Sequence, residues 1–232
     1  MKILALLLSA FFTIHCFANQ TLFLAAEDSW PPFSRSDGEG ISQQIIRKAC
    51  ASVGIQVEFI VVPYARALHM VKTKEVDGAF NVTKQQSTLA EFSFGEEPLL
   101  QVSASFYYPS HSQSDFKSIA DVPDNTVIAL ILGYEYGELY EKNRQRFREI
   151  RVSNQTQVIN LLLRNRVDMA ILFDDVAAYY LTQMQLAKDS IKKGHLNHIS
   201  DIYVAFNRSA ELLPLIEKLD NGLKLNREKT QP

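Results

Sequence analysis

The sequence predicts an α/β protein built from two lobes with a ligand cleft between them. Between residues 21 and 82, apolar or β-branched segments alternate with amphipathic helices in the order β-α-β-α-β, which implies a parallel sheet with crossover helices. An extended segment follows at residues 102–108, and the alternation then starts again, which indicates a second unit. The 232 residues are 47% hydrophobic and 22% charged, a globular balance that excludes a disordered or low-complexity chain.

The first unit is read from short apolar runs and from the residues that end its helices. Gly54 follows a helical pattern in the position where glycine ends a helix, and the β-branched run after it is typical of a strand. Between the first strand and the first helix lies a loop, residues 27–40, with two prolines and two glycines. The predicted strands are residues 21–26, 57–62 and 76–82, and the predicted helices are residues 41–53 and 63–74.

The second unit repeats this pattern and ends with a return to the first. The predicted strands are residues 126–132, 150–152, 167–173 and 202–206, and the predicted helices are residues 136–148, 155–164, 176–187 and 210–223. Extended segments near residues 102–108 and 200–206 join the units. We expect lobe 1 to comprise residues 19–102 and 203–232, and lobe 2 to comprise residues 103–202. Two open parallel sheets that face each other form a cleft that closes by a hinge.

The first eighteen residues predict a signal peptide. Lys2 is followed by an apolar run, residues 3–14, and then by small side chains at Cys16 and Ala18, which suit cleavage after Ala18. The run is shorter than the roughly 20 residues that span a bilayer. The alternative is a buried first helix. Export predicts a periplasmic protein, and since Cys50 would then be the remaining cysteine, no intramolecular disulfide is expected.

Charge and motifs argue against several functional classes. The formal net charge is −2 and the basic residues are not clustered, so no nucleic-acid partner is expected. The histidines of the exported chain lack the spacing of a metal site, and no phosphate-binding loop, dinucleotide fingerprint or nucleophile elbow is present. The sequence therefore predicts no metal and no cofactor.

Several short motifs, in their order and spacing, resemble the extracellular solute-binding proteins of family 3, the type that serves amino-acid ABC transporters. They are residues 29–33 (SWPPF), 40–54, 63–68 (PYARAL), 76–79 (VDGA), 133–137 (GYEYG) and 166–168 (RVD) with 174–178 (DDVAA). The resemblance implies a periplasmic-binding-protein fold of type II. It also implies a monomer that binds a small-molecule solute and presents it to an ABC transporter permease or a membrane sensor.

Aromatic and polar residues near strand ends are candidate ligand contacts. Trp30 and Tyr64 leave neighbouring strand-loop units, where two rings can hold a small ligand between them; the alternative is that these two aromatic side chains seal the core of lobe 1. Asn81 and Thr83 are polar residues at the end of an apolar strand, which favours hydrogen bonding in a pocket. Gly133 and Tyr134 open a segment whose backbone N–H groups form either an anion site or a simple turn.

The sequence departs from the family at the position where amino-acid binders carry an arginine that binds the ligand carboxylate. Alignment places Gln86 or Thr88 at that position, and Lys84 is the sole cation between residues 81 and 98. Lysine lacks the planar fork of arginine, so it is an imperfect substitute. Arg66 either supplies a replacement cation or forms a surface ion pair. An α-amino acid ligand is therefore in question.

In lobe 2, the acidic partner for a ligand amino group is Asp174 by one alignment, whereas the other places Phe173 there. Asp174 is either a pocket residue or a helix cap. The leading hypothesis is a binding protein for a small polar organic solute, amino-acid-like or an amine. One alternative is a dehydratase-type enzyme on the same fold, with Glu27, Asp28 or Asp174 as general acid. Another is an accessory protein whose cleft has lost its ligand.

Overall fold

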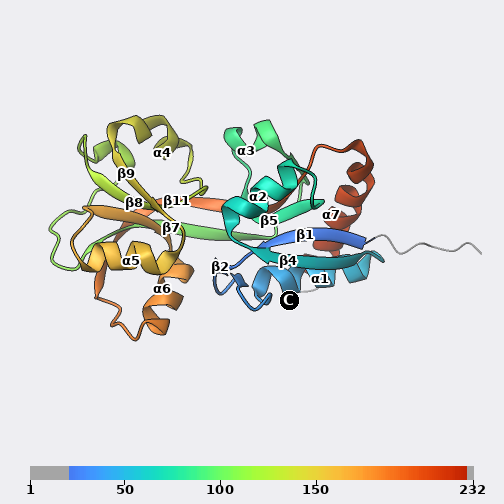
Figure 1. Ribbon diagram of the computed structural model, residues 1–232, viewed down its shortest axis with the longest axis horizontal. Helices are drawn as coiled ribbons and strands as arrows, with labels where there is room; N and C mark the ends of the chain where they lie inside the picture. Colours follow the sequence, from blue (N-terminus) through green and yellow to red (C-terminus); the bar gives the residue numbers. More distant parts are fainter. Residues whose placement is uncertain (1–20, 229–232) are drawn as a thin grey trace, which may run out of the picture.

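Two long antiparallel strands, β7 (Leu100–Pro109) and β11 (Ile191–Phe206), run through the middle of the molecule and belong to both lobes (Figure 1). The computed structural model describes residues 21–228. Its main sheet has the order β4-β1-β5-β11-β7-β10-β8-β9, with β6 also paired to β11. One continuous sheet therefore passes from lobe 1, through the two central strands, into lobe 2.

Lobe 1 is built on three parallel strands with helices on both faces (Figure 1). The central strand, β1, has the sequence TLFLAAE and buries its last four residues, which is why it lies between two neighbours. The strands of lobe 1 are β1 (Thr21–Glu27), β4 (Gln56–Val62), β5 (Gly78–Thr83), β6 (Ser93–Phe94) and the small hairpin of β2 (Ser29–Trp30) and β3 (Ser34–Arg35). Its helices are α1 (Ile41–Ser52), α2 (Tyr64–Lys72), α3 (Gln86–Glu91), the 3₁₀ turn η3 (Ala210–Leu212) and α7 (Leu213–Glu228).

Lobe 2 continues the sheet from β7 with one antiparallel and two parallel pairings. Asn154 caps α5 by accepting a hydrogen bond from the backbone N–H of Gln157 (3.1 Å). The strands are β8 (Val127–Ile131), β9 (Arg148–Val152) and β10 (Met169–Phe173). The helical segments are η1 (Ile119–Asp121), α4 (Glu138–Asn143), η2 (Arg144–Arg146), α5 (Gln155–Leu163) and α6 (Asp174–Gln183).

The predicted α/β architecture of two lobes is confirmed, but several predicted elements are wrong in extent. The helices expected at residues 176–187 and 210–223 are α6, which ends at Gln183, and α7, which begins at Leu213 and ends at Glu228. The strand expected at residues 202–206 begins at Ile191, because the polar stretch before residue 202 pairs along β7 without being buried on both faces. The helix expected at residues 136–148 ends at Asn143 and gives way to a 3₁₀ turn and β9. The predicted lobe boundaries fall in or near β7 and β11 and stay a prediction, and the signal peptide lies outside the described residues.

Buried apolar residues form two clusters. One lies between the sheet of lobe 1 and helices α1 and α7, where Gly222 lets the backbone of α7 approach that of Ala49. The other runs from lobe 1 into lobe 2 and includes Trp30, Tyr64 and Tyr134. The two lobes therefore share one core across the cleft.

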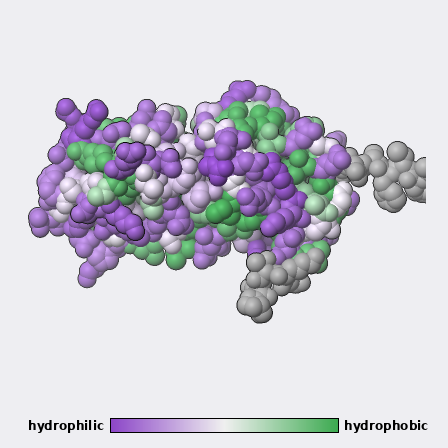
Figure 2. Space-filling view, turned by 90° about the horizontal axis from the view of Figure 1, so that it is seen from below, coloured by the Kyte–Doolittle hydropathy of each residue, from purple (hydrophilic) through white to green (hydrophobic). Residues whose placement is uncertain are grey.

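Figure 2 shows a lower face on which hydrophobic patches are separated by hydrophilic residues. Within residues 21–228, no helix combines the length and the apolar character needed to cross a membrane.

Candidate functional site

A small cavity lies between the lobes, where the carboxyl ends of β1, β5 and β10 meet the loop that follows β8. It has room for about one water molecule. Side chains of both lobes surround it: Glu27, Trp30, Tyr64, Asn81, Thr83, Tyr134, Glu135 and Phe173. Its position agrees with the general rule that ligands of open α/β sheets bind beyond the carboxyl ends of the strands.

Glu27 is the last residue of β1, and its side chain is 1% exposed. The hydroxyl of Tyr134 donates a hydrogen bond to its carboxyl group from the opposite lobe. Burial raises the pKa of Glu27 from 4.5 to about 8; the hydrogen bond from Tyr134 opposes this rise, and the negative charges of Asp28 and Glu135 add to it. Near neutral pH, this carboxyl group is therefore predominantly protonated in the structure described here.

Glu135, in the loop before α4, reaches the cavity from lobe 2. Its carboxylate accepts hydrogen bonds from the hydroxyls of Tyr64 and Thr83, both at 3.2 Å and both in lobe 1. Burial raises its pKa to about 7, although these hydrogen bonds lower it. Together with the bond between Tyr134 and Glu27, three side-chain hydrogen bonds thus join the two lobes at the cavity.

Aromatic rings form much of the cavity wall. The Trp30 ring is 1% exposed and lies edge-on to Phe173 at 5.2 Å between ring centroids, while Tyr64 and Tyr134 meet in a T-shaped contact at 4.9 Å. The indole N–H of Trp30 has no hydrogen-bond partner among the described residues. A buried donor without a partner costs free energy, so this group is suited to a hydrogen bond with a bound molecule.

A β-bulge directs Asn81 into the cavity. The register between β5 and β11 pairs Val82 with Tyr203 and Phe80 with Val204, which leaves Asn81 as the extra residue, with φ of 66°. Asparagine adopts this left-handed conformation more readily than most residues. Its side-chain oxygen accepts a hydrogen bond from the Ser42 hydroxyl (2.6 Å), and its amide nitrogen has no partner among the described residues.

Five predicted site residues thus line the cavity together: Trp30, Tyr64, Asn81 and Thr83 from lobe 1 and Tyr134 from lobe 2. Gly133 lies beside them, with φ of 85°, and its Cα faces Tyr64 and Ala65 across the cleft. The segment after it carries Glu138 and Glu141 in the first turn of α4, so this end of the helix is acidic.

The predicted cations lie outside the cavity. Arg66 forms an exposed ion pair with Glu75 (2.8 Å). The Lys84 ammonium donates to the carbonyl oxygen of Gly95 (3.2 Å) and lies over the ring of Tyr203. Neither group is placed to hold a ligand carboxylate in this cavity.

Thr88 and Asp174 are also engaged elsewhere. The Thr88 hydroxyl donates to the carbonyl oxygen of Thr83 (2.7 Å) and accepts from the backbone N–H of Gln85 (2.9 Å), so it caps α3. The Asp174 carboxylate accepts from Ser105 and Tyr107 and pairs with Lys193 at 2.9 Å. Phe173, the alternative to Asp174, lines the cavity instead.

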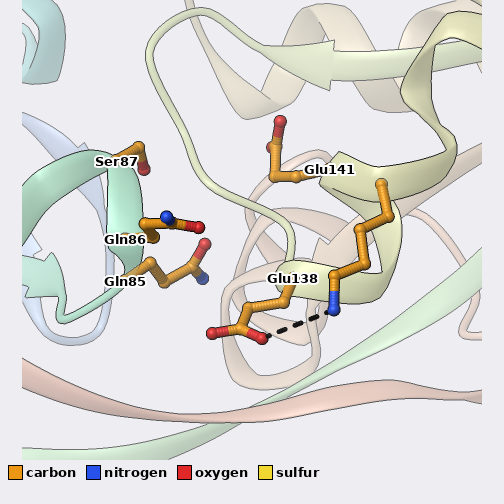
Figure 3. Close-up of a pocket in the computed structure, with 6 residues that line it drawn as sticks. Gln85, Gln86, Ser87, Glu138 and Glu141 are labelled. Atoms are coloured by element: carbon orange, nitrogen blue, oxygen red, sulfur yellow. Dashed lines mark ion pairs between the residues drawn. The ribbon is translucent and has the colours of Figure 1, made fainter.

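A wider groove of about 450 Å³ opens between α3 of lobe 1 and α4 of lobe 2. In Figure 3, Gln85, Gln86 and Ser87 stand on one wall, and Glu138 and Glu141 on the other. Glu138 is paired with Lys142 at 4.0 Å. Gln86, one of the two positions expected for the family's arginine, therefore faces a wall of two glutamates and a lysine.

Sequence reasoning named Glu27 only as an acid for the enzyme alternative, and it assigned no role to Glu135. The available signal was a glutamate directly after a buried strand and another inside the motif at residues 133–137. Within residues 21–228, no group of three or more histidine, cysteine or acidic residues is placed to hold a metal ion.

Comparisons with known proteins bear on the fold and on the family. No curated protein sequence matches the chain. A histidine kinase sensor domain with similarity to periplasmic binding proteins aligns with a TM-score of 0.78 at 15% identity, covering 91% of this chain and 92% of that one. The amino acid ABC transporter substrate-binding protein AbpA from Streptococcus pneumoniae, bound to L-arginine, aligns with a TM-score of 0.73 at 17% identity, covering 90% of each chain.

An ancestral amino acid-binding protein, described as a precursor of cyclohexadienyl dehydratase, aligns with a TM-score of 0.72 at 16% identity over 90% of each chain. At these identities the three structures show the fold alone. The family assignment rests on sequence, since the profile of the bacterial extracellular solute-binding proteins, family 3, matches residues 22–204. The chain therefore belongs to the bacterial extracellular solute-binding proteins, family 3.

Proposed function

We propose that this protein captures a small polar organic solute between its two lobes. The observation that carries the proposal is the cavity itself: eight residues from both lobes surround it, and two buried N–H donors that line it, those of Trp30 and Asn81, lack partners among the described residues. Membership of a solute-binding family supports the same role.

A solute that touches both lobes stabilises the closed arrangement by its differential affinity for the closed and open forms. The paired strands β7 and β11 connect the lobes and form the hinge. The closed form is then presented in the periplasm, after cleavage behind Ala18, to an ABC transporter permease or a membrane sensor. The protein acts as a monomer.

The test is saturable binding without turnover. We would express residues 19–232, purify the protein through an unfolding and refolding step, and screen amino acids, amines, organic acids and short peptides by thermal shift. A ligand that binds only the native state raises the melting temperature by mass action. Trp30→Ala should abolish the shift, while the control Phe23→Ala, at a side chain 42% exposed on the surface, should keep it. Absence of any shift would favour the accessory-protein alternative.

One observation favours a second candidate. The dehydratase alternative needs a carboxyl group with a raised pKa in an apolar cleft, and Glu27 has this property. Incubation of the protein with cyclohexadienyl acids, followed by chromatography of the products, separates the two functions. Conversion that is lost in Glu27→Gln would establish the enzyme, and binding without conversion would establish the binding protein.

A further inference from the structure

The cavity contains two acidic side chains and no basic one. None of its eight lining residues is lysine, arginine or histidine. Within residues 21–228, neither Glu27 nor Glu135 forms an ion pair, and the side chains that donate hydrogen bonds to them are neutral hydroxyls. Removing an ionised carboxylate from water is costly unless a cation accompanies it. Without a cation Glu27 therefore holds a proton near neutral pH, and a cation placed beside it would let it ionise.

Basic side chains near the cavity are engaged elsewhere. Arg151 donates to the carbonyl oxygen of Tyr134 (3.2 Å) but is paired with Glu149 (2.8 Å). Arg66 is paired with Glu75 on the surface, and Lys84 is held by the carbonyl group of Gly95 and lies 3.8 Å from Glu96. A cation between the two glutamates would have to come from a bound molecule.

The walls of the cavity also suit a cation. The rings of Trp30, Tyr64 and Phe173 surround the carboxyl groups, and aromatic faces attract ammonium groups. The unpartnered N–H groups of Trp30 and Asn81, on side chains 1% and 6% exposed, are neutral donors that suit one uncharged oxygen of the same molecule.

We propose that the solute is a small organic cation, an amine without a carboxylate, whose ammonium group lies between Glu27 and Glu135. It replaces the Tyr134 hydroxyl as the donor to Glu27, and the lobes must separate to admit its body, since the cavity as it stands has room for about one water molecule. This inference rests on the proposed function and narrows it: a carboxylate on the ligand would meet two glutamates and find no arginine.

The experiment compares amines with the amino acids that carry the same skeleton. Agmatine is paired with arginine, putrescine with ornithine, cadaverine with lysine, tyramine with tyrosine and histamine with histidine, and each is titrated into refolded residues 19–232 by calorimetry. At least one amine should bind about tenfold or more tightly than its amino acid. Glu27→Gln and Glu135→Gln should each weaken the binding of that amine by about tenfold or more. Glu58→Gln, at an exposed glutamate of β4, should leave its binding unchanged.

Each contrary outcome has a distinct meaning. If an amino acid binds as tightly as its amine, or if only organic acids or peptides bind, the cation proposal is overturned and solute binding stands. If amines bind but neither glutamate variant weakens them, the placement between Glu27 and Glu135 is wrong. If nothing in either panel binds, both the cation proposal and the proposed function fail.

Discussion

The buried carboxyl group of Glu27 makes a quantitative prediction about stability and pH. Its pKa rises from 4.5 to about 8 on folding, so the folded protein holds a proton that the unfolded chain releases between these values. Stability therefore falls as pH rises through this window. At about 1.4 kcal/mol per pKa unit, full ionisation of Glu27 costs about 5 kcal/mol of unfolding free energy. Glu27→Gln removes this cost and keeps an oxygen for the Tyr134 hydroxyl.

The assay is urea unfolding of residues 19–232 at several pH values from about 5 to about 9, with no solute added. Trp30, the one tryptophan of the chain, reports unfolding by fluorescence. Wild type and Glu27→Gln should be similarly stable at the acidic end, and the variant should be more stable by several kcal/mol at the alkaline end. Glu58→Gln controls for the change in net charge. A difference between wild type and Glu27→Gln that stays constant with pH would refute the reasoning.

Three further predictions concern the cleft and the core. Binding of an amine should release about one proton at about pH 7.5, because the ammonium keeps Glu27 ionised; calorimetry in two buffers of different ionisation enthalpy measures this, and equal heats would contradict it. Tyr134→Phe removes the hydroxyl that competes for Glu27, so the amine should bind several-fold more tightly, and weaker binding would show instead that the hydroxyl contacts the solute. Gly222→Ala places a methyl group against the Ala49 backbone and should cost about 1–3 kcal/mol in urea unfolding, whereas Asn221→Ala, on the exposed side of α7, should cost little.

The sequence was sufficient for the architecture, because buried strands and the helices between them have distinct periodicities. Trp30, Tyr64, Asn81 and Thr83 were predicted as site residues since polar or aromatic side chains at strand ends are unusual, and all four line the cavity. The role of Glu135 depends on the apposition of two lobes far apart in sequence, which no local pattern encodes.

Other features depended on pairing rather than on composition. The polar half of β11 is a strand only because β7 lies beside it. The bulge that directs Asn81 into the cavity arises from a register shift against Tyr203 and Val204, and a single sequence contains no record of register.

The hydroxyl of Tyr134 has a consequence for the concentration at which the protein would respond. A solute that needs Glu27 must displace a side chain of the protein, so its apparent dissociation constant equals the intrinsic one divided by the fraction of molecules in which Tyr134 has moved away. If that fraction is about one in five, the response threshold rises about fivefold. Tyr134 would then act as a built-in competitor that sets the threshold, and a substitution at this residue could shift the working range without altering the residues that recognise the solute.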